Sequence, residues 1–287
     1  MNQLTDIHTG LPTWDIKPCS REDVSHAIDG LKPSASSGVD NISNRLIKTL
    51  KFEALDALTF VFNRSIDLGV FPSCWKQGRI KPTFKKGSRS CLGNYRPICL
   101  MSNIGKLLEA VILNQLTCHL ESIFPNNMFG FRPGRSTQDA VVHTLDNIHQ
   151  LRESGYLVAV VAFDATSAFD CLDHSVILRS LEAIGVGSKM RTWISSFLKD
   201  CLIQVDIDGH LSSPWTVNIG VGQGRKLSPP LYNVGTLTQL LFNLLSQMSS
   251  YADDSCDVIH ARSSEDCNKR ILEVVSDRIQ WIKDVGL

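Results

Sequence analysis

Residues 156–170 read YLVAVVAFDATSAFD, and this stretch decides the fold class. Its first half, residues 156–163, is a continuous apolar run rich in β-branched side chains, which predicts a strand buried on both faces. Asp164 follows the run immediately. The stretch therefore predicts a core strand that ends on a carboxylate.

Helices are predicted on both sides of this strand. Ser20 with Asp23, and Ser136 with Asp139, have the spacing of capping boxes at helix starts. Asp208-Gly209 predicts the turn of a hairpin that pairs residues 202–207 with 215–219, and residues 70–100 are predicted to be irregular. The predicted helices cover residues 24–31, 52–68, 104–116, 136–153, 174–184, 193–198, 229–247 and 265–284. Because helices and strands mix without strict alternation, the fold class is predicted to be α+β.

Length and composition limit the kind of protein. A chain of 287 residues suits one or two domains. No apolar run approaches the ~20 residues of a membrane span, and the N-terminus lacks a signal pattern. The nine cysteines form an odd set without a C-x-x-C pair, which argues against a zinc site and a secreted disulfide framework. We expect an intracellular protein, nuclear or cytoplasmic, with reduced thiols.

The distribution of charge is more informative than its sum. A net charge of zero speaks against a nucleic-acid binder. Residues 68–108, however, contain no Asp or Glu, and a one-sided basic segment suits a polyanion such as a triphosphate or a template strand. A solvated surface loop is the alternative. The basic residues of this segment are Lys76, Arg79, Lys81, Lys85, Lys86, Arg89, Arg96 and Lys106.

A second acidic feature lies near the C-terminus, where Asp253 and Asp254 are adjacent. Neighbouring residues of a strand point to opposite faces, so a shared site requires a tight turn at a hairpin tip. Beside Asp164 they would form a carboxylate cluster that repels itself unless cations neutralise it. Two Mg²⁺ ions suit such oxygen ligands. Polymerases, nucleases and phosphatases share this chemistry, and an ordinary exposed turn is the alternative.

Five blocks occur in the order of reverse transcriptase sequences. They are NYRPICL at 94–100, GFRPGRST at 130–137, AFDATSAFD at 162–170, GVGQG at 220–224 and YADD at 251–254. The stretches from Trp75 and from Phe169 resemble non-LTR, LINE-like retrotransposons of the jockey and CR1 type. The resemblance covers roughly residues 71–287. A different phosphohydrolase would not require the YRPI and GFRPGRST blocks.

The resemblance implies a right-hand polymerase. Residues 66–287 would form the reverse transcriptase domain, with fingers at about 66–155 and an incomplete palm, an antiparallel sheet with helices, at about 156–287. A helical extension would occupy residues 1–65, and the thumb is expected to be absent. The implied activity is two-metal, RNA-directed DNA polymerisation with two Mg²⁺ ions, for which Mn²⁺ could substitute. The implied partners are an RNA template, a DNA primer and deoxynucleoside triphosphates, without a membrane.

The same resemblance implies roles for particular residues. Phe169 matches the bulky residue under the sugar that excludes a 2′-hydroxyl, with ordinary core packing as the alternative. Lys85 and Lys86 would reach the outer phosphates, or form a solvated pair. The metal ligands and catalytic residues would be Asp164, Asp253 and Asp254. Gln223 would contact the nucleotide, and Arg96 would contact the triphosphate. Arg132 and Arg135 would either contact the template or cap the next helix.

The sequence departs from the family pattern in its second half. Gly222 replaces a proline, Arg225 a serine and Ser228 a glycine, and Arg225 is expected to bring bulk and charge beside the nucleotide site. Cys201 stands where an arginine is common, while Ser249, Ser250 and Asp257 stand in strands expected to be apolar. Two hypotheses follow: an active polymerase fragment, or a catalytically inactive remnant with at most weak nucleic-acid binding.

Overall fold

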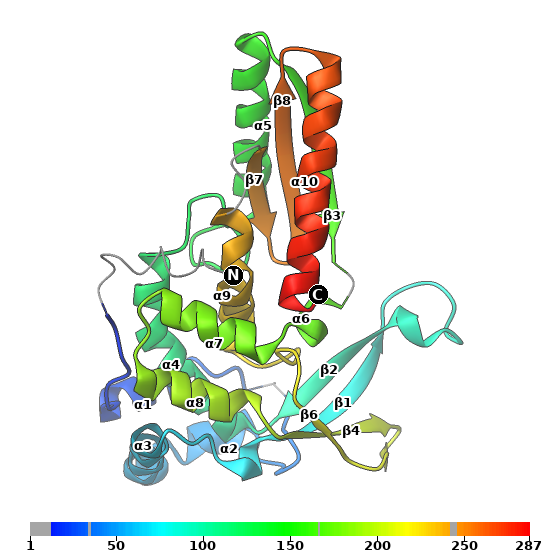
Figure 1. Cartoon of the computed structure of the whole chain (residues 1–287). Helices are drawn as coiled ribbons and strands as arrows, with labels where there is room; N and C mark the ends of the chain where they lie inside the picture. Colours follow the sequence, from blue (N-terminus) through cyan, green and yellow to red (C-terminus); the bar gives the residue numbers. More distant parts are fainter. Residues whose placement is uncertain (1–12, 34–35, 166, 242–245) are drawn as a thin grey trace.

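The structure is a computed structural model that describes residues 13–33, 36–165, 167–241 and 246–287. It contains two sheets and a set of helices, which confirms the predicted α+β class. In Figure 1 the smaller sheet stands between two long helices, and the larger sheet projects from the helical base. Within the described ranges, no helix combines the length and apolar composition that crossing a membrane needs.

Among the described residues, eight helices overlap the predicted ones, and two short helices at residues 44–49 and 168–171 were not predicted. The helices are α1 (Arg21–Asp29), α2 (Asn44–Thr49), α3 (Lys51–Leu68), α4 (Asn103–Glu121), α5 (Thr137–Glu153), α6 (Ala168–Cys171), α7 (His174–Ala183), α8 (Ser188–Leu198), α9 (Ser228–Leu241) and α10 (Ser264–Val285). Both predicted capping boxes, at Ser20 and Ser136, are present. The prediction of a helix that reaches residue 247 was wrong, because Ser246 already begins a strand; residues 242–245 lie outside the described ranges.

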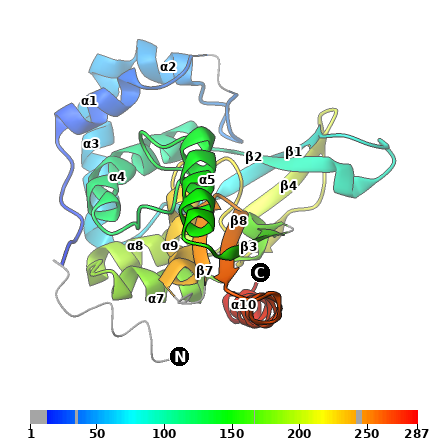
Figure 2. The same ribbon diagram turned by 90° about the horizontal axis from the view of Figure 1, so that it is seen from above.

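The smaller sheet is antiparallel, in the order β3 (Leu157–Asp164), β8 (Asp254–Ala261), β7 (Ser246–Tyr251). Figure 2 shows α5 and α10 on opposite sides of it. The prediction that the first strand is buried on both faces was wrong. β3 is an edge strand whose outer parts the helices do not cover, and Leu157 and Val160 are 49% and 50% exposed.

The larger sheet corrects a second prediction. Residues predicted to be irregular form an antiparallel hairpin of β1 (Gln77–Phe84) and β2 (Tyr95–Met101). Two prolines hid it in the sequence, because Pro82 and Pro97 face each other across the hairpin. Only residues 77–80 of β1 also pair with β4, so Pro82 lies where the other edge of β1 is free and needs no N–H donor.

The predicted second hairpin is confirmed in part, because residues 201–203 pair with 215–217 as expected, whereas residues 206–207 pair with 210–211. β4 (Cys201–Ile207) turns through Asp208-Gly209 into β5 (His210–Leu211) and also pairs with β6 (Trp215–Val217). Asp208 and Gly209 have φ angles of 51° and 86°, the left-handed values that a tight hairpin turn requires. β4 also joins β1 in parallel, which connects this hairpin to the first one.

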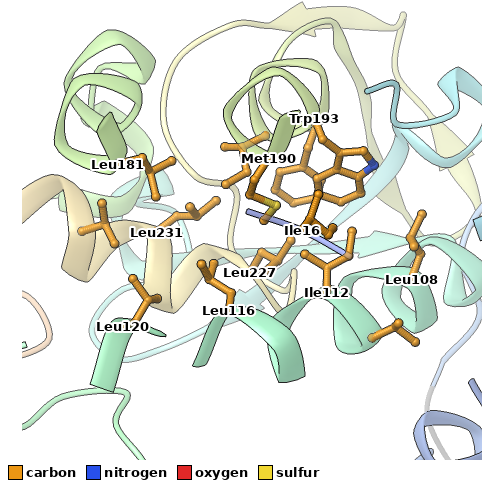
Figure 3. Close-up of a cluster of buried hydrophobic side chains, with 14 of the residues drawn as sticks. Ile16, Leu108, Ile112, Leu116, Leu120, Leu181, Met190, Trp193, Leu227 and Leu231 are labelled. Carbon is orange, nitrogen blue, oxygen red and sulfur yellow. The ribbon is translucent and has the colours of Figure 1, made fainter. Parts of the chain in front are cut away.

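The main hydrophobic core lies between α4, α8 and α9. Figure 3 shows Trp193 and Met190 from α8 facing Leu108 and Ile112 from α4, with Leu231 of α9 beside them. Trp193 is fully buried, and its indole N–H donates to Ser65 at 3.0 Å. This core fixes the start of α9, and therefore the loop of residues 220–227 that precedes it.

Candidate active site

Asp164 and Asp254 are brought together by the strand register. Asp164 ends β3 and Asp254 begins β8, and the two residues are direct partners in the antiparallel pair. Such partners point to the same face of a sheet. Both side chains are exposed. The strand that decides the fold therefore delivers its carboxylate beside the second acidic motif.

The predicted tight turn at the tip of the β7–β8 hairpin is also present. Tyr251 pairs with Asp254, so Ala252 and Asp253 alone make the turn. Ala252 has a φ of 58°, a left-handed conformation that costs an alanine roughly 1–2 kcal/mol. The surrounding contacts must therefore hold this turn in its shape.

The carboxylates affect one another electrostatically. Burial and the charges of Asp253 and Asp164 raise the pKa of Asp254. Burial, with the charges of Asp253 and Asp254, also raises the pKa of Tyr232. A divalent cation would relieve this repulsion, so the chemistry of the donor set fits a metal. In the part of the chain that the structure describes, however, no three such side chains already lie at metal-ligand spacing.

Phe169 lies in an aromatic stack beside this site. Its ring is parallel to that of Tyr232, with centroids 4.4 Å apart, and meets Phe131 edge-on at 5.6 Å. The side chain is partly buried, on α6. Its carbonyl accepts a hydrogen bond from the N–H of Val221 at 2.7 Å, which ties it to the loop that carries Gln223.

Gln223 lies in a loop that is fastened to the β1–β2 hairpin. The backbone carbonyl of Gln223 accepts a hydrogen bond from the N–H of Cys99 at 3.2 Å. The side-chain amide of Gln223 donates to the carboxylate of Asp170 at 3.5 Å. Burial raises the pKa of Asp170, and the Gln223 contact opposes that shift. Asp170, Gln223 and Arg225 are the polar side chains at a mostly apolar cavity of about 210 Å³, together with Ser228.

The candidate cations lie on the β1–β2 hairpin. Arg96 is exposed on β2, and Lys85 and Lys86 are exposed just beyond β1, where the N–H of Lys85 donates to Asn94 at 2.8 Å. Within the described residues, these three side chains form no ion pair with protein carboxylates. Figure 1 shows the hairpin projecting away from the helices.

The arginines of the GFRPGRST block differ in placement. Arg132 is buried, pairs with Glu121 at 2.9 Å and donates to the carbonyls of Pro125 and Met128. Arg135 is partly exposed, packs over Phe129 and donates to Asn126 at 3.0 Å. The burial of Arg132 favours a structural role for this residue over a template contact.

Arg225 lines the same cavity as Gln223, and its guanidinium is held against α8 and the start of β4. It is 8% exposed, and its guanidinium lies 4.4 Å from the centre of the Phe197 ring. It donates to the carbonyl of Phe197 and to the sulfur of Cys201, both at 3.0 Å. Cys201 is small enough to leave this space, so two departures from the family pattern contact each other.

The other departures also have partners. The hydroxyl of Ser228 donates to the carbonyl of Gly222 at 2.9 Å, which closes the loop around Gln223. Ser249 shares a hydrogen bond with Thr144 at 2.8 Å. The buried Asp257 accepts from Arg278 of α10 at 2.6 Å. Polar groups inside a protein are costly unless they are paired, and these are paired.

Glu109 is a residue of the site that the sequence reasoning missed. It is buried on α4, and its carboxylate accepts from the backbone N–H groups of Lys226 and Leu227, at 2.6 and 3.2 Å. Burial raises its pKa, and the charge of Arg225 opposes this. The signal was a lone glutamate within the apolar run of that helix. Glu109 holds the chain that leads from Gln223 into α9.

The chain is similar to known proteins of one family. The profile of the family described as “Reverse transcriptase (RNA-dependent DNA polymerase)” matches residues 83–287. The probable RNA-directed DNA polymerase from transposon BS of Drosophila melanogaster is 28% identical over 97% of this chain and 32% of its own length. The RNA-directed DNA polymerase from the mobile element jockey of the same species is 28% identical over 92% of this chain and 30% of its own.

The probable RNA-directed DNA polymerase from transposon X-element is 27% identical over 96% of this chain and 31% of its own length. The chain thus spans about a third of the curated relatives that it matches. The similarity is distant but extends over most of the chain, and these relatives come from non-LTR elements related to jockey, BS and X-element.

Proposed function

Because this chain belongs to the reverse transcriptase family, we propose that it is an RNA-directed DNA polymerase domain that adds deoxynucleotides to a primer 3′-hydroxyl. The observation that carries the proposal is the pairing of Asp164 with Asp254, beside a turn that presents Asp253. Three carboxylates at one end of a sheet, exposed and mutually repelling, suit divalent cations and phosphate chemistry.

Asp164, Asp253 and Asp254 would hold the two Mg²⁺ ions, with Mn²⁺ as a substitute. Bound there, such ions would activate the attacking hydroxyl and stabilise the leaving phosphate oxygen. The protein's own part is to hold three carboxylates at one place despite their repulsion. The strand register pairs Asp164 with Asp254, and the turn at Ala252 presents Asp253 beside them, which supports this role.

The remaining residues would bind the nucleotide. Phe169 would lie under the sugar and exclude a 2′-hydroxyl, with Tyr232 behind it as a rigid support. Gln223 would contact the nucleotide from its fastened loop. Arg96 suits a triphosphate because a guanidinium can donate two parallel hydrogen bonds, and Lys85 or Lys86 would supply a point charge.

The RNA template and the DNA primer would lie between the hairpin and the smaller sheet. In this proposal residues 66–155 would form the fingers and residues 156–287 would belong to the palm, with a helical extension before them. The boundary at residue 66 falls inside α3. Arg135, which is partly exposed, is the better candidate for a template contact than the buried Arg132.

Primer extension on an RNA template tests the proposal. Wild-type protein with Mg²⁺ should extend the primer, and Asp253→Asn should abolish extension because it removes a ligand charge without changing side-chain shape. Asp277→Asn, an exposed aspartate on α10, is the matched control and should extend like the wild type. Unchanged extension by Asp253→Asn would refute the assignment of the metal ligands.

A domain that binds nucleic acid without adding nucleotides is the second candidate. The basic side chains that the β1–β2 hairpin exposes could bind phosphates in either case. This candidate predicts salt-sensitive binding to primer–template without extension in Mg²⁺ or Mn²⁺. The same preparation distinguishes the two functions, since binding and extension are measured separately.

A further inference from the structure

The GFRPGRST block contacts the hairpin turn that carries Asp253. The chain before it runs alongside the end of β7: the N–H of Ser250 donates to Asn127 at 3.0 Å, and the N–H of Phe129 donates to Ser250 at 2.9 Å. The side-chain amide of Asn127 donates to the carbonyl of Met248 at 2.8 Å. Residues 127–130 therefore form a seat for the turn, which we name the turn seat.

Gly130 brings the turn seat against the turn itself. A Cβ atom at this position would overlap the backbone nitrogen of Ala252, and would lie 2.9 Å from its Cα and 3.0 Å from the carbonyl carbon of Tyr251. These are backbone atoms, so no side-chain rotation can relieve the overlap. Only a glycine allows this approach.

Side chains from other elements hold the turn seat in place. Asn233 of α9, 2% exposed, donates to the carbonyl of Gly130 at 2.8 Å. Arg132 donates to the carbonyls of Pro125 and Met128 and is anchored by Glu121. The turn seat therefore joins α4, α9 and the β7–β8 hairpin, and it cannot move away freely when a larger residue replaces Gly130.

We infer that Gly130 is a positioning residue for the metal site: it sets where the Ala252–Asp253 turn lies relative to Asp164. The inference rests on the proposed function, in that the turn matters because Asp253 and Asp254 would bind cations. In this way the GFRPGRST block acts on the metal site through backbone contact with the turn. A side chain at residue 130 would push Asp253 away from its partners.

The test compares Gly130→Ala with Gly134→Ala in the full chain. Gly134 lies in the same block, and a Cβ there meets nothing within 4 Å, so the strain that its φ of 70° causes in an alanine stays local and does not reach the turn. Both variants add one methyl group at a glycine of this block, and only the first touches the turn. The first readout is the hydrogen exchange of residues 248–254 without metal. The second is the affinity for Mn²⁺, measured by electron paramagnetic resonance, with Asp253→Asn as the non-binding reference.

Gly130→Ala should speed exchange in residues 248–254 and weaken Mn²⁺ binding by about 10- to 100-fold, the range seen when a residue supporting metal ligands is changed. Gly134→Ala should behave like the wild type in both readouts. Wild-type exchange in Gly130→Ala would overturn the inference. So would faster exchange with unchanged Mn²⁺ affinity, because the contact would then serve stability alone.

Two further outcomes are separable. If wild-type protein binds no Mn²⁺, the proposed function fails, and exchange alone decides whether Gly130 positions the turn. If Gly130→Ala does not fold, Asn127→Ala replaces it, because it removes one hydrogen bond of the turn seat. That variant should shift the same residues and the same Mn²⁺ affinity by a smaller factor, and wild-type values for both would overturn the inference.

Discussion

Phe169 allows two roles to be separated at the scale of a single residue. Its ring is held between Tyr232 and Phe131, so it is both packed and close to the aspartates. Phe169→Val should raise ribonucleotide incorporation relative to deoxynucleotide incorporation, because the bulk under the sugar is removed. It should also lower stability by about 1–3 kcal/mol, as a large-to-small substitution in a packed site does.

The measurement is the ratio of the two incorporation rates, beside a thermal melt. Phe62→Val is the matched control, since Phe62 is fully buried in the core but does not belong to this aromatic stack. It should lower the melting temperature and leave the ratio unchanged. If Phe169→Val did the same, Phe169 would be only a core residue.

Arg225 shows why a departure from a family pattern is not always damage. Restoring the family's serine would remove the guanidinium donor of the Phe197 carbonyl and the cation that acts most strongly on Glu109. We expect Arg225→Ser to lower the free energy of unfolding by about 2–4 kcal/mol. Lys226→Ser removes the same charge from an exposed neighbour and should change it by less than about 0.5 kcal/mol.

Urea unfolding followed by circular dichroism measures both changes. If Arg225→Ser were as stable as the wild type, the contacts of Arg225 with Cys201 and Phe197 would contribute nothing to stability. The presence of an arginine in place of the family's serine would then have no structural benefit.

At the scale of elements, α10 is joined to the smaller sheet by a buried ion pair. Arg278 and Asp257 are 4% and 0% exposed and are 2.6 Å apart. Arg278→Met should destabilise the protein by about 3–5 kcal/mol, because it leaves Asp257 as a buried charge without its cationic partner. The double variant Asp257→Leu/Arg278→Met should regain most of that stability. Thermal and urea unfolding check this, and a double variant as unstable as the single one would contradict it.

The β1–β2 hairpin is the element expected to contact phosphates. Replacing Lys85, Lys86 and Arg96 together by Gln should weaken primer–template binding and reduce its salt dependence, by about 0.7–0.9 in the logarithmic slope for each phosphate that is no longer neutralised. Fluorescence anisotropy at several salt concentrations measures that slope. A control with the same change in net charge replaces three exposed lysines elsewhere, Lys32, Lys269 and Lys283. Equal slopes in the two triple variants would show that the hairpin does not bind the phosphates.

Elements with local signals could be predicted from the sequence, and others could not. The capping boxes at Ser20 and Ser136 depend on residues three apart, so α1 and α5 were identified correctly. The β1–β2 hairpin was missed because its prolines are tolerated only where β1 has a free edge. The exposure of β3 was missed for a related reason, since a strand's place in a sheet depends on partners far away in the sequence.

For the whole molecule, the same limit applies to the candidate site. The two acidic motifs could be found from their residues, and the turn at Asp253 from the need for both carboxylates to face one site. The close contact of Gly130 with Ala252 could not be foreseen, because it joins segments that only the complete fold brings together. The contact between Arg225 and Cys201 could not be foreseen for the same reason, so the sequence showed two unrelated departures from the family pattern.

We propose, as the central claim, that the polymerase site is active and that the contacts of Arg225 and Ser228 stabilise the altered loop of residues 220–227. Single-nucleotide extension of a DNA primer on an RNA template tests it most directly, with wild-type protein beside the double variant Gly222→Pro/Arg225→Ser. A Cβ at residue 222 would meet nothing within 4 Å, so there is space for a side chain at this position. We predict Mg²⁺-dependent extension by the wild type and weaker extension by the double variant. No extension by the wild type in Mg²⁺ or Mn²⁺, together with extension by the double variant, would contradict the claim.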